Sequence, residues 1–387
     1  MIHRLSQTKE RLSNLVGFDT TSAYSNLGII EWIEAQVAPL GARIERLPNS
    51  EGDKANLWIR FGPDADGGVL LSGHTDVVPV AGQDWATDPF TLTERNGRLY
   101  GRGACDMKGF IALCLAYAED FADEAIGQPV HFAFSYDEEV GCLGAPDMIH
   151  DIAKRGPRPS AAIIGEPTEW GVVSAHKSID TFFVTVTGRE AHSSRTDLGV
   201  SAIQEAARFI SALNDLGDQA RTRVPKDSDF APPETTLTVG TIAGGEAANI
   251  LAKTCRFQFD IRVPSTDDRD FYLQAVTSLA DEADARIKAR APEGGFNLTH
   301  RSGAPGLAPE TAGAAEALAR AITGDNETRV APFATEAGQF QTYGGFSTIV
   351  CGPGSIAQAH QPNEYLEVAQ LARGVEVFDR LLARLKA

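Results

Sequence analysis

VLLSGHTD, at residues 69–76, decides the fold class, because an uninterrupted apolar run ends there in a polar cluster. Two later stretches have the same form, VHFAFSYDEE at 130–139 and AAIIGEPT at 161–168. Residues 108–121 and 144–154 lie between them and have helical spacing. Short buried strands that alternate with helices are typical of βαβ units around a mostly parallel sheet. The first part of the chain is therefore predicted to be α/β.

A different pattern begins near residue 180. The segments from there to residue 300 read in turn as strand, helix, strand, strand, helix and strand: 180–188, 200–213, 234–245, 254–263, 271–287 and 296–300. This β-α-β-β-α-β order predicts a small split-βαβ, ferredoxin-like α+β domain. A helix, an apolar strand and a closing helix then follow: 312–322, 347–352 and 366–386. We predict one α/β domain, residues 1–179 and 303–387, interrupted by an inserted domain, residues 180–302.

Composition excludes several functional classes. The 387 residues include 35 Lys and Arg against 52 Asp and Glu, a formal net charge of −17, which would repel nucleic acid and anionic membranes. No apolar run approaches the roughly 18 residues that span a bilayer, and the N-terminus lacks the apolar core of a signal peptide. The five cysteines are scattered and never spaced CxxC, which indicates neither a disulfide framework nor a thiolate zinc site. A cytoplasmic location is expected.

Metal-ligand side chains follow four of the predicted strands. These are His74 with Asp76, the pair Glu138 and Glu139, Glu166, and His360 in the loop after the strand at 347–352. The carboxyl ends of parallel strands meet at one edge of the sheet, where α/β proteins bind their ligands. Asp106, in the glycine-rich GRGACDMKG at 101–109, is a further candidate. Two histidines with several carboxylates and no thiolate favour zinc, cobalt or manganese.

Spacing suggests a role for each side chain. Asp76 lies two residues beyond His74 on an extended segment, so its carboxylate is predicted to accept the second imidazole N–H. Glu138 and Glu139 would point opposite ways on an extended backbone, so that one binds metal and the other is a general base. Asp106 is the candidate for a carboxylate that bridges two metals roughly 3.5–4 Å apart.

Each motif also has a simpler interpretation. An isolated HxD is more often a surface turn, adjacent acids usually form a solvated strand end, and a glycine-rich loop is commonly just a turn. Cys105 is expected to be a small buried residue, with a thiol ligand as the alternative. The metal-site hypothesis depends on the motifs occurring together at strand ends.

Five ordered segments resemble a known family: SGHTDVVPV (72–80), DWATDPFTLTERNGRLYGRGACDMKG (84–109), YDEEVGCLGA (136–145), IIGEPTE (163–169) and CGPGSIAQAHQPNEYL (351–366). They are similar to the dinuclear zinc amidohydrolases, which include acetylornithine deacetylase, succinyl-diaminopimelate desuccinylase, aminoacylase and glutamate carboxypeptidase. The resemblance covers nearly the whole chain. The sequences of these segments are most similar to the acetylornithine deacetylase branch of the family.

The resemblance implies two divalent metal ions per chain, most often zinc, with cobalt or manganese as alternatives. It implies that His74 binds one ion, Asp106 bridges both, Glu139 and Glu166 each hold one, and His360 completes the second site. Glu138 then corresponds to the general base and Asp76 to the partner of His74. A cis peptide after Asp106 is also implied.

The inserted domain resembles the dimerisation lid of the family, which implies a homodimer. His192 matches a family histidine that reaches across the dimer to polarise the scissile carbonyl. Arg262 matches an arginine that binds the α-carboxylate of the substrate. Asn249 matches an asparagine near the same carboxylate. Without the resemblance, Arg262 reads as a surface arginine and His192 as a loop histidine. Glu336 is predicted to line the pocket and receive a cationic substrate side chain, and the role of Lys177 is left open.

The implied reaction is hydrolysis of a small N-acyl amino acid. N-acetyl-L-ornithine, cleaved to L-ornithine and acetate in arginine biosynthesis, is the first expectation. Alternatives in the same family are succinyl-diaminopimelate, acetylcitrulline, other N-acyl amino acids and dipeptides, since pocket chemistry decides among them and motifs do not. A non-catalytic binding protein on the same scaffold is a remote alternative. No nucleic-acid or membrane partner is expected.

Overall fold

The computed structural model describes residues 2–123 and 125–386. The chain forms two compact units. The second unit comprises His176–Gly306 with the short return segment Ala331–Ala334, and the first comprises the remaining segments on both sides of it. Each unit has its own apolar core.

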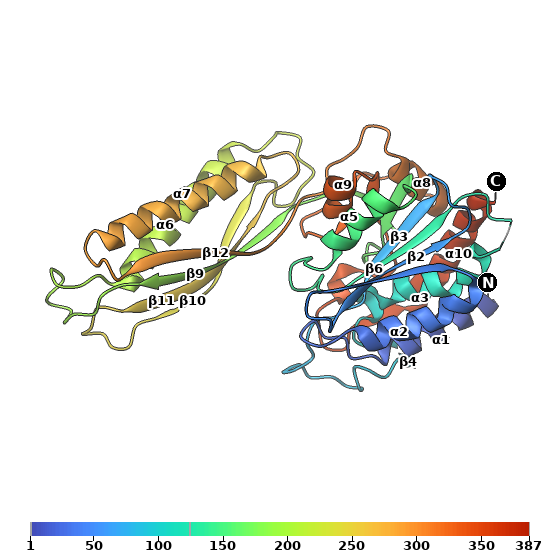
Figure 1. Ribbon diagram of the computed structural model, residues 1–387, viewed down its shortest axis with the longest axis horizontal. Coiled ribbons are helices and arrows are strands. Elements are labelled where there is room, and N and C mark those ends of the chain that lie inside the picture. Colours follow the sequence, from blue (N-terminus) through green and yellow to red (C-terminus); the bar gives the residue numbers. More distant parts are fainter. Residues whose placement is uncertain (1, 124, 387) are drawn as a thin grey trace. The chain divides into compact units, whose positions relative to one another are not determined.

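An eight-stranded sheet organises the first unit (Figure 1). Its strand order is β1-β2-β6-β3-β7-β14-β8-β13. The bounds are β1 Arg43–Pro48, β2 Ala55–Phe61, β3 Val69–His74, β6 Val130–Ser135, β7 Ala161–Ile164, β8 Val173–His176, β13 Arg329–Ala331 and β14 Thr348–Val350. The central strands β6, β3, β7 and β14 are parallel, whereas β2 and β1 extend the sheet antiparallel. The mostly parallel α/β fold is confirmed.

Helices cover both faces of this sheet. The main core packs apolar side chains of six helices against one face: α1 Ile2–Val16, α2 Leu27–Val37, α3 Gly109–Ala116, α4 Ala118–Phe121, α8 Ala314–Thr323 and α10 Val368–Leu385. The other face carries α5 Ala145–Arg155 and α9 Ala337–Gly344 (Figure 1). Every residue of α3 is buried, so this helix has no polar side. The single helix predicted at 108–121 is wrong in one respect, because Tyr117 separates α3 from a short α4, Ala118–Phe121.

A three-stranded sheet joins two distant parts of the first unit. Its order is β15-β5-β4, with β4 at Thr93–Arg95, β5 at Arg98–Tyr100 and β15 at Tyr365–Glu367. Antiparallel pairing sets Leu99 opposite Leu366, and both side chains are buried. The segment before Asp106 is thereby held beside the segment after His360.

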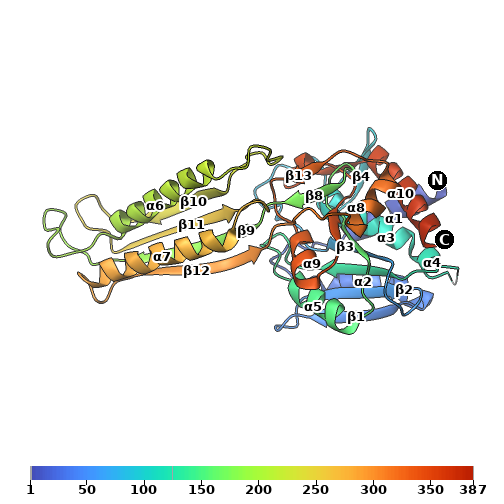
Figure 2. The same cartoon turned by 90° about the horizontal axis from the view of Figure 1, so that it is seen from above.

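The second unit has the predicted β-α-β-β-α-β order. Its elements are β9 Ile179–Thr187, α6 Ala202–Thr222, β10 Thr236–Gly244, β11 Thr254–Arg262, α7 Arg269–Lys288 and β12 Gly295–Ala304. The antiparallel sheet runs β10-β11-β9-β12, and α6 and α7 lie side by side on one face (Figure 2). Alternate residues of β9 and β11 are buried against these helices, as period-2 strands with one covered face require. Ser201 and Asp268 cap the two helices.

Among the described residues, no helix is long and apolar enough to cross a membrane. All five cysteines are buried and unpaired, in keeping with the absence of a disulfide framework.

Candidate active site

His74 is the last residue of β3, at the carboxyl edge of the parallel strands. Its Nδ1 donates to the backbone oxygen of Asp76 at 2.9 Å, which leaves Nε2 as the free ring nitrogen, 3.0 Å from Asp106 Oδ1. The prediction that the Asp76 carboxylate accepts this N–H is wrong in detail, because its Oδ1 lies 3.6 Å from Nδ1. The Asp76 carbonyl oxygen therefore lies closer to His74 Nδ1 than the Asp76 carboxylate does.

The Asp76 carboxylate instead holds the loop of the paired glutamates. It accepts the backbone N–H groups of Glu138 and Glu139, both at 3.2 Å, and the hydroxyl of Ser22 at 2.7 Å. Glu138 and Glu139 lie in a turn rather than on an extended backbone, since the N–H groups of Gly141 and Cys142 return to the Glu138 carbonyl. The predicted alternation of the two side chains on a strand is therefore wrong, and a turn orients them.

Asp106 lies at the centre of the cluster. It sits at a kink within Ala104–Lys108, just after Gly103, and its φ of −120° and ψ of 91° are not helical. Gly103 has φ +78°, and a Cβ there would meet Val77 at 2.7 Å, so glycine is needed at this bend. Asp106 Oδ1 faces His74 and Oδ2 lies 3.3 Å from His360 Nε2. The peptide after Asp106 is cis.

The remaining predicted ligands complete the cluster. Glu139 Oε2 lies 2.9 Å from His360 Nε2, and Glu166 Oε1 lies 4.0 Å from His74 Nε2. Ligand atoms of His74, Asp106 and Glu139 all lie within 4.8 Å of one another. His360 is the most exposed member, with 54% of its side chain accessible. The structure thus brings together all five residues predicted as metal ligands, with Glu138 in the adjoining turn.

Burial and mutual repulsion perturb the acids of the cluster. Burial raises the pKa of Glu138 to about 7. Burial and then the charge of Asp106 raise the pKa of Glu139 to about 8, and the same two causes raise that of Glu166 well above its usual value. Burial alone would raise the pKa of Asp106, but hydrogen bonds to His360 and His74 lower it. Protein groups alone therefore leave these carboxylates short of positive charge.

The imidazoles respond in the opposite sense. Hydrogen bonds to Asp106 and Glu139 raise the pKa of His360 to about 10. Burial would lower the pKa of His74, but its hydrogen bond to Asp106 and the nearby carboxylates of Asp76 and Glu166 raise it well above the usual value. An acid-rich nitrogen and oxygen donor set of this kind suits divalent cations, which supply the missing charge. The residues present fit a metal site.

The predicted substrate residues of the second unit lie at two ends of its sheet. His192 and Asn249 are exposed loop residues that meet, because Ser193 N donates to Asn249 O at 2.9 Å and His192 bridges to Ile250. Arg262 ends β11 at its other end. Eight residues of strand at about 3.3 Å each separate Thr254 from Arg262 by roughly 26 Å. The structure therefore does not bring Arg262 together with His192 and Asn249 within one chain.

Three residues with open or uncertain roles are buried. Glu336, just before α9, is 1% exposed; burial raises its pKa to about 7, and its Oε1 has no hydrogen-bond partner among the described residues. Lys177 donates to the carbonyl of Glu234 at 2.6 Å, and burial lowers its pKa. The Cys105 thiol contacts Ser355 O at 3.5 Å, and burial raises its pKa well above the usual value. Cys105 is thus a small buried residue.

Sequence reasoning missed two neighbours of the candidate base and its loop. Ser22 binds the Asp76 carboxylate from far away in the sequence, and no sequence signal marks it. Cys142 Sγ lies 3.3 Å from Glu138 Oε1. Its position in YDEEVGCLGA, four residues after Glu138, is a signal that could have been used.

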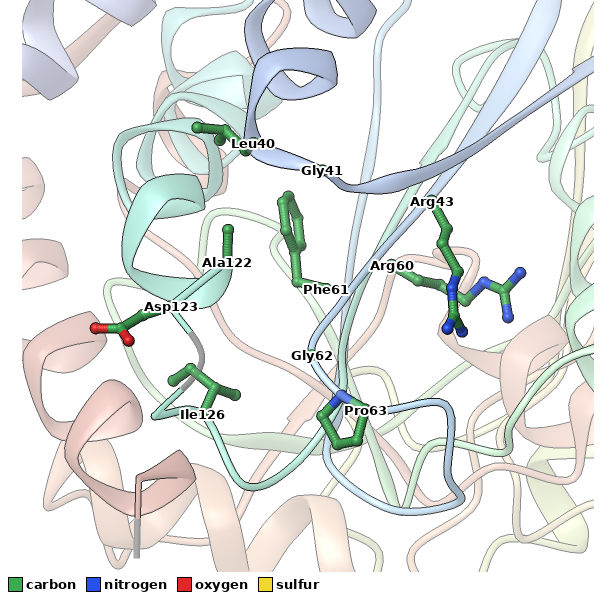
Figure 3. A pocket seen from close by; sticks show the side chains of 10 residues that line it. All are labelled: Leu40, Gly41, Arg43, Arg60, Phe61, Gly62, Pro63, Ala122, Asp123 and Ile126. Carbon is green, nitrogen blue, oxygen red and sulfur yellow. The ribbon is translucent and has the colours of Figure 1, made fainter.

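A separate cavity of about 450 Å³ lies at the opposite edge of the sheet (Figure 3). Phe61, which lines it, pairs with Val130 at the start of β6, and Val130 pairs with Val69 at the start of β3. The cavity thus adjoins the amino ends of the strands whose carboxyl ends carry the cluster. Its two arginines are paired, Arg43 with Asp64 at 2.6 Å and Arg60 with Glu45 at 3.0 Å.

Comparisons with known proteins agree with this architecture. Residues 70–384 match Peptidase family M20/M25/M40. Acetylornithine deacetylase of Proteus mirabilis is 35% identical over 367 residues, which cover 94% of this chain and 91% of that protein. The M20 family metallo-carboxypeptidase structure from Sulfolobus solfataricus has a TM-score of 0.78 at 16% identity, covering 98% of this chain and 99% of that one. A dinuclear metal binding peptidase of the M20 family from Bacillus subtilis has a TM-score of 0.66 at 13% identity, covering 99% of both chains.

The fold and the sequence matches define a hydrolase of the metallopeptidase class. The chain belongs to Peptidase family M20/M25/M40, as a match over more than three quarters of its length and a 35% identical relative establish.

Proposed function

We propose that this hydrolase cleaves the amide bond of N-acetyl-L-ornithine, releasing L-ornithine and acetate. The observation that carries the proposal is the convergence of His74, Asp106, Glu139 and His360 beside Glu138 at one sheet edge. The substrate comes from the relatives, because the Proteus mirabilis protein carries the name acetylornithine deacetylase. Succinyl-diaminopimelate, acetylcitrulline, other N-acyl amino acids and dipeptides are the alternatives.

The metal site would use the five converging residues. His74 with Glu166 would hold one ion, Glu139 with His360 the other, and Asp106, whose two oxygens face the two imidazoles, would bridge them. Two divalent ions, zinc most readily, polarise a bound carbonyl oxygen and lower the pKa of a bound water molecule. The dinuclear metal-binding relative from Bacillus subtilis supports two ions per chain.

Glu138 would move the proton. It would take a proton from the attacking water as the new C–O bond forms, and deliver it to the amide nitrogen as the C–N bond breaks. The products are then a carboxylate and a free amine. Asp76 would keep Glu138 in position through the backbone N–H of the turn, and Cys142 through its thiol contact.

The second unit would supply substrate contacts from two chains. Arg262 would bind the substrate α-carboxylate with its planar fork. His192, with Asn249, would reach the acyl carbonyl in the partner subunit's site, since about 26 Å of strand separates them from Arg262 in one chain and a small amino acid cannot span it. This distance supports a homodimer in which residues 180–302 act as dimerisation domain and lid to the metal-binding residues 1–179 and 303–387.

Glu336 would favour ornithine over neutral substrates. Its carboxyl is buried with one unpartnered oxygen, and a substrate ammonium would complete its hydrogen bonds. Glu336→Gln should raise KM for N-acetyl-L-ornithine more than for N-acetyl-L-methionine. Equal changes for both substrates would remove Glu336 from substrate recognition.

The direct test compares turnover of N-acetyl-L-ornithine and N-succinyl-L,L-diaminopimelate. The chain is stripped with a chelator, reloaded with zinc or cobalt, and assayed for released amine beside a chelated control. Metal-dependent ornithine release supports the proposal. Metal-dependent turnover of the succinyl substrate alone would assign the chain to another specificity, and no turnover of either by the metal-loaded chain would overturn the ornithine assignment.

A further inference from the structure

Glu364 is a buried carboxylate that the proposed reaction does not use. Its side chain is 1% exposed, and it lies four residues after His360. Both of its oxygens are fully engaged. Oε1 accepts the backbone N–H groups of Cys105 at 2.9 Å and Asp106 at 3.1 Å, and Oε2 accepts Gly103 N–H at 3.0 Å and Arg102 Nη1 at 2.7 Å.

These contacts fix the loop that presents Asp106. Three of the four donors are backbone N–H groups of the bend at 103–106, so the carboxylate sets the path of the main chain there. No helix or strand ladder includes these three hydrogen bonds. The carboxylate is fully paired, by one buried guanidinium and three backbone amides, and such paired buried groups are rigid. Arg102 Nε has no hydrogen-bond partner among the described residues.

The same network extends to His360. Arg102 also donates to Gln83 Oε1, which accepts Trp85 Nε1 as well. Gln83 Nε2 donates to the backbone oxygen of His360 at 3.0 Å. A continuous chain of hydrogen bonds therefore links the backbones of Asp106 and His360, whose side chains lie 3.3 Å apart.

We infer that Glu364 is a positioning residue that sets the spacing between Asp106 and His360, and so determines the affinity of the second metal position. The inference rests on the proposed metal-binding roles of those two residues. A glutamine at position 364 would have the same size as the glutamate. Its N–H₂ group, however, would replace one of the two accepting oxygens. It would then face two hydrogen-bond donors, either those of Arg102 and Gly103 or those of Cys105 and Asp106. Groups that orient metal ligands typically change metal affinity by about 10–100-fold when they are replaced.

The experiment measures zinc affinity of the full chain by competition with a chromogenic chelator, and the visible spectrum of the cobalt-loaded chain. Glu364→Gln should weaken one of two zinc equivalents by about 10–100-fold and alter the cobalt spectrum. Glu310→Gln is the matched control, because Glu310 also accepts from a backbone N–H, Thr348 at 3.2 Å, and from Ser347 at 2.6 Å, at the amino end of β14. It should bind zinc like the wild type.

A double variant separates positioning from charge balance. Arg102→Gln with Glu364→Gln removes both buried charges, which should restore much of the thermal stability that either single change costs. Zinc affinity of the double variant should stay low if the Glu364 carboxylate positions the loop. If the Glu364→Gln single variant does not fold, the double variant is measured in its place. Wild-type zinc affinity in either variant would overturn the inference. A wild-type chain that binds no zinc would instead overturn the proposed metal site.

Discussion

In the first unit the side chains of four candidate ligands, His74, Asp106, Glu139 and Glu166, are at most 7% exposed, and hydrogen bonds fix most of them before any ligand arrives. In the second unit His192 and Asn249 are exposed and contact little beyond their own loops. Under the proposed function, the first unit supplies a preorganised site, whereas His192 and Asn249 of the second unit act only against another surface. Variants that remove one type of residue should therefore fail in different ways.

The largest effect is expected at the candidate base. Glu138→Gln keeps the shape of the turn but removes the proton acceptor, so kcat should fall by about 10²–10⁴-fold. Metal content, measured by elemental analysis, should stay near two ions per chain. Glu139→Gln is the paired control, and it should lose metal because Glu139 faces His360. Loss of metal from the Glu138→Gln variant would show that Glu138 is the metal ligand and would contradict its role as the general base.

The next effect tests whether the exposed residues act on a partner. His192→Ala should lower kcat by about 10²–10³-fold, the usual cost of one donor to a developing oxyanion. Mixing this variant with Glu138→Gln under subunit exchange places one intact site in each mixed dimer. Recovery of about a quarter of wild-type activity is expected, because half of the dimers are mixed at random. If His192 served its own chain, no recovery would occur.

Arg262 should give a smaller, binding-type effect. Arg262→Gln loses a charge-assisted pair with the substrate carboxylate, about 1.5–3 kcal/mol or 10–100-fold in kcat/KM. Steady-state kinetics with N-acetyl-L-ornithine should show most of the change in KM. Arg256→Gln, an exposed residue of the same strand, is the matched control. An equal loss in both variants would point to damage of β11 rather than of a carboxylate site.

The smallest effect concerns stability in the first unit, away from the cluster. Burial and then Arg60 lower the pKa of His131 to about 4 from its usual 6.5, and its Nδ1 accepts Trp58 Nε1 at 3.3 Å. The unfolded chain binds this proton near pH 6.5, so the contribution to stability is complete above pH 6.5 and is lost as pH falls toward 4.

Between pH 7 and pH 5, wild-type stability should therefore fall by about 2 kcal/mol more than that of His131→Gln. Denaturant unfolding at the two pH values measures this difference, and the acid sensitivity of the metal site cancels because both chains share it. Parallel pH profiles for the two chains would show that folding does not lower the pKa of His131.

Local patterns predicted much of the fold. The central strands follow from apolar runs, and the β-α-β-β-α-β order of the second unit follows from period-2 alternation, as in β9, and from helical spacing. The return segment Ala331–Ala334 was not predicted. β1 was not predicted, because RIERLP carries three charged residues and exposes much of its surface at the sheet edge. The eight-strand order depends on pairings between distant segments, such as β14 with β7, which no local pattern encodes.

The candidate site was predicted by residue type but not by geometry. The strand-end rule placed His74, Glu139 and Glu166 at one edge, because parallel strands share a direction. The turn at Glu138 and the carbonyl contact of Asp76 depend on backbone dihedrals that spacing does not fix. The role of Glu364 was missed, because its partners at 102–106 lie about 260 positions earlier in the chain.

That separation also has a consequence for biosynthesis. The ribosome makes Asp106 long before Glu364, and at about 5–20 residues per second the intervening 258 positions take on the order of 10–50 s. During that interval the 103–106 bend has no carboxylate to receive its amides, and β5 lacks β15 beside it. Until residues 364–367 have been made, the segment that presents Asp106 therefore lacks these contacts, and the cluster can take its final geometry only after that point.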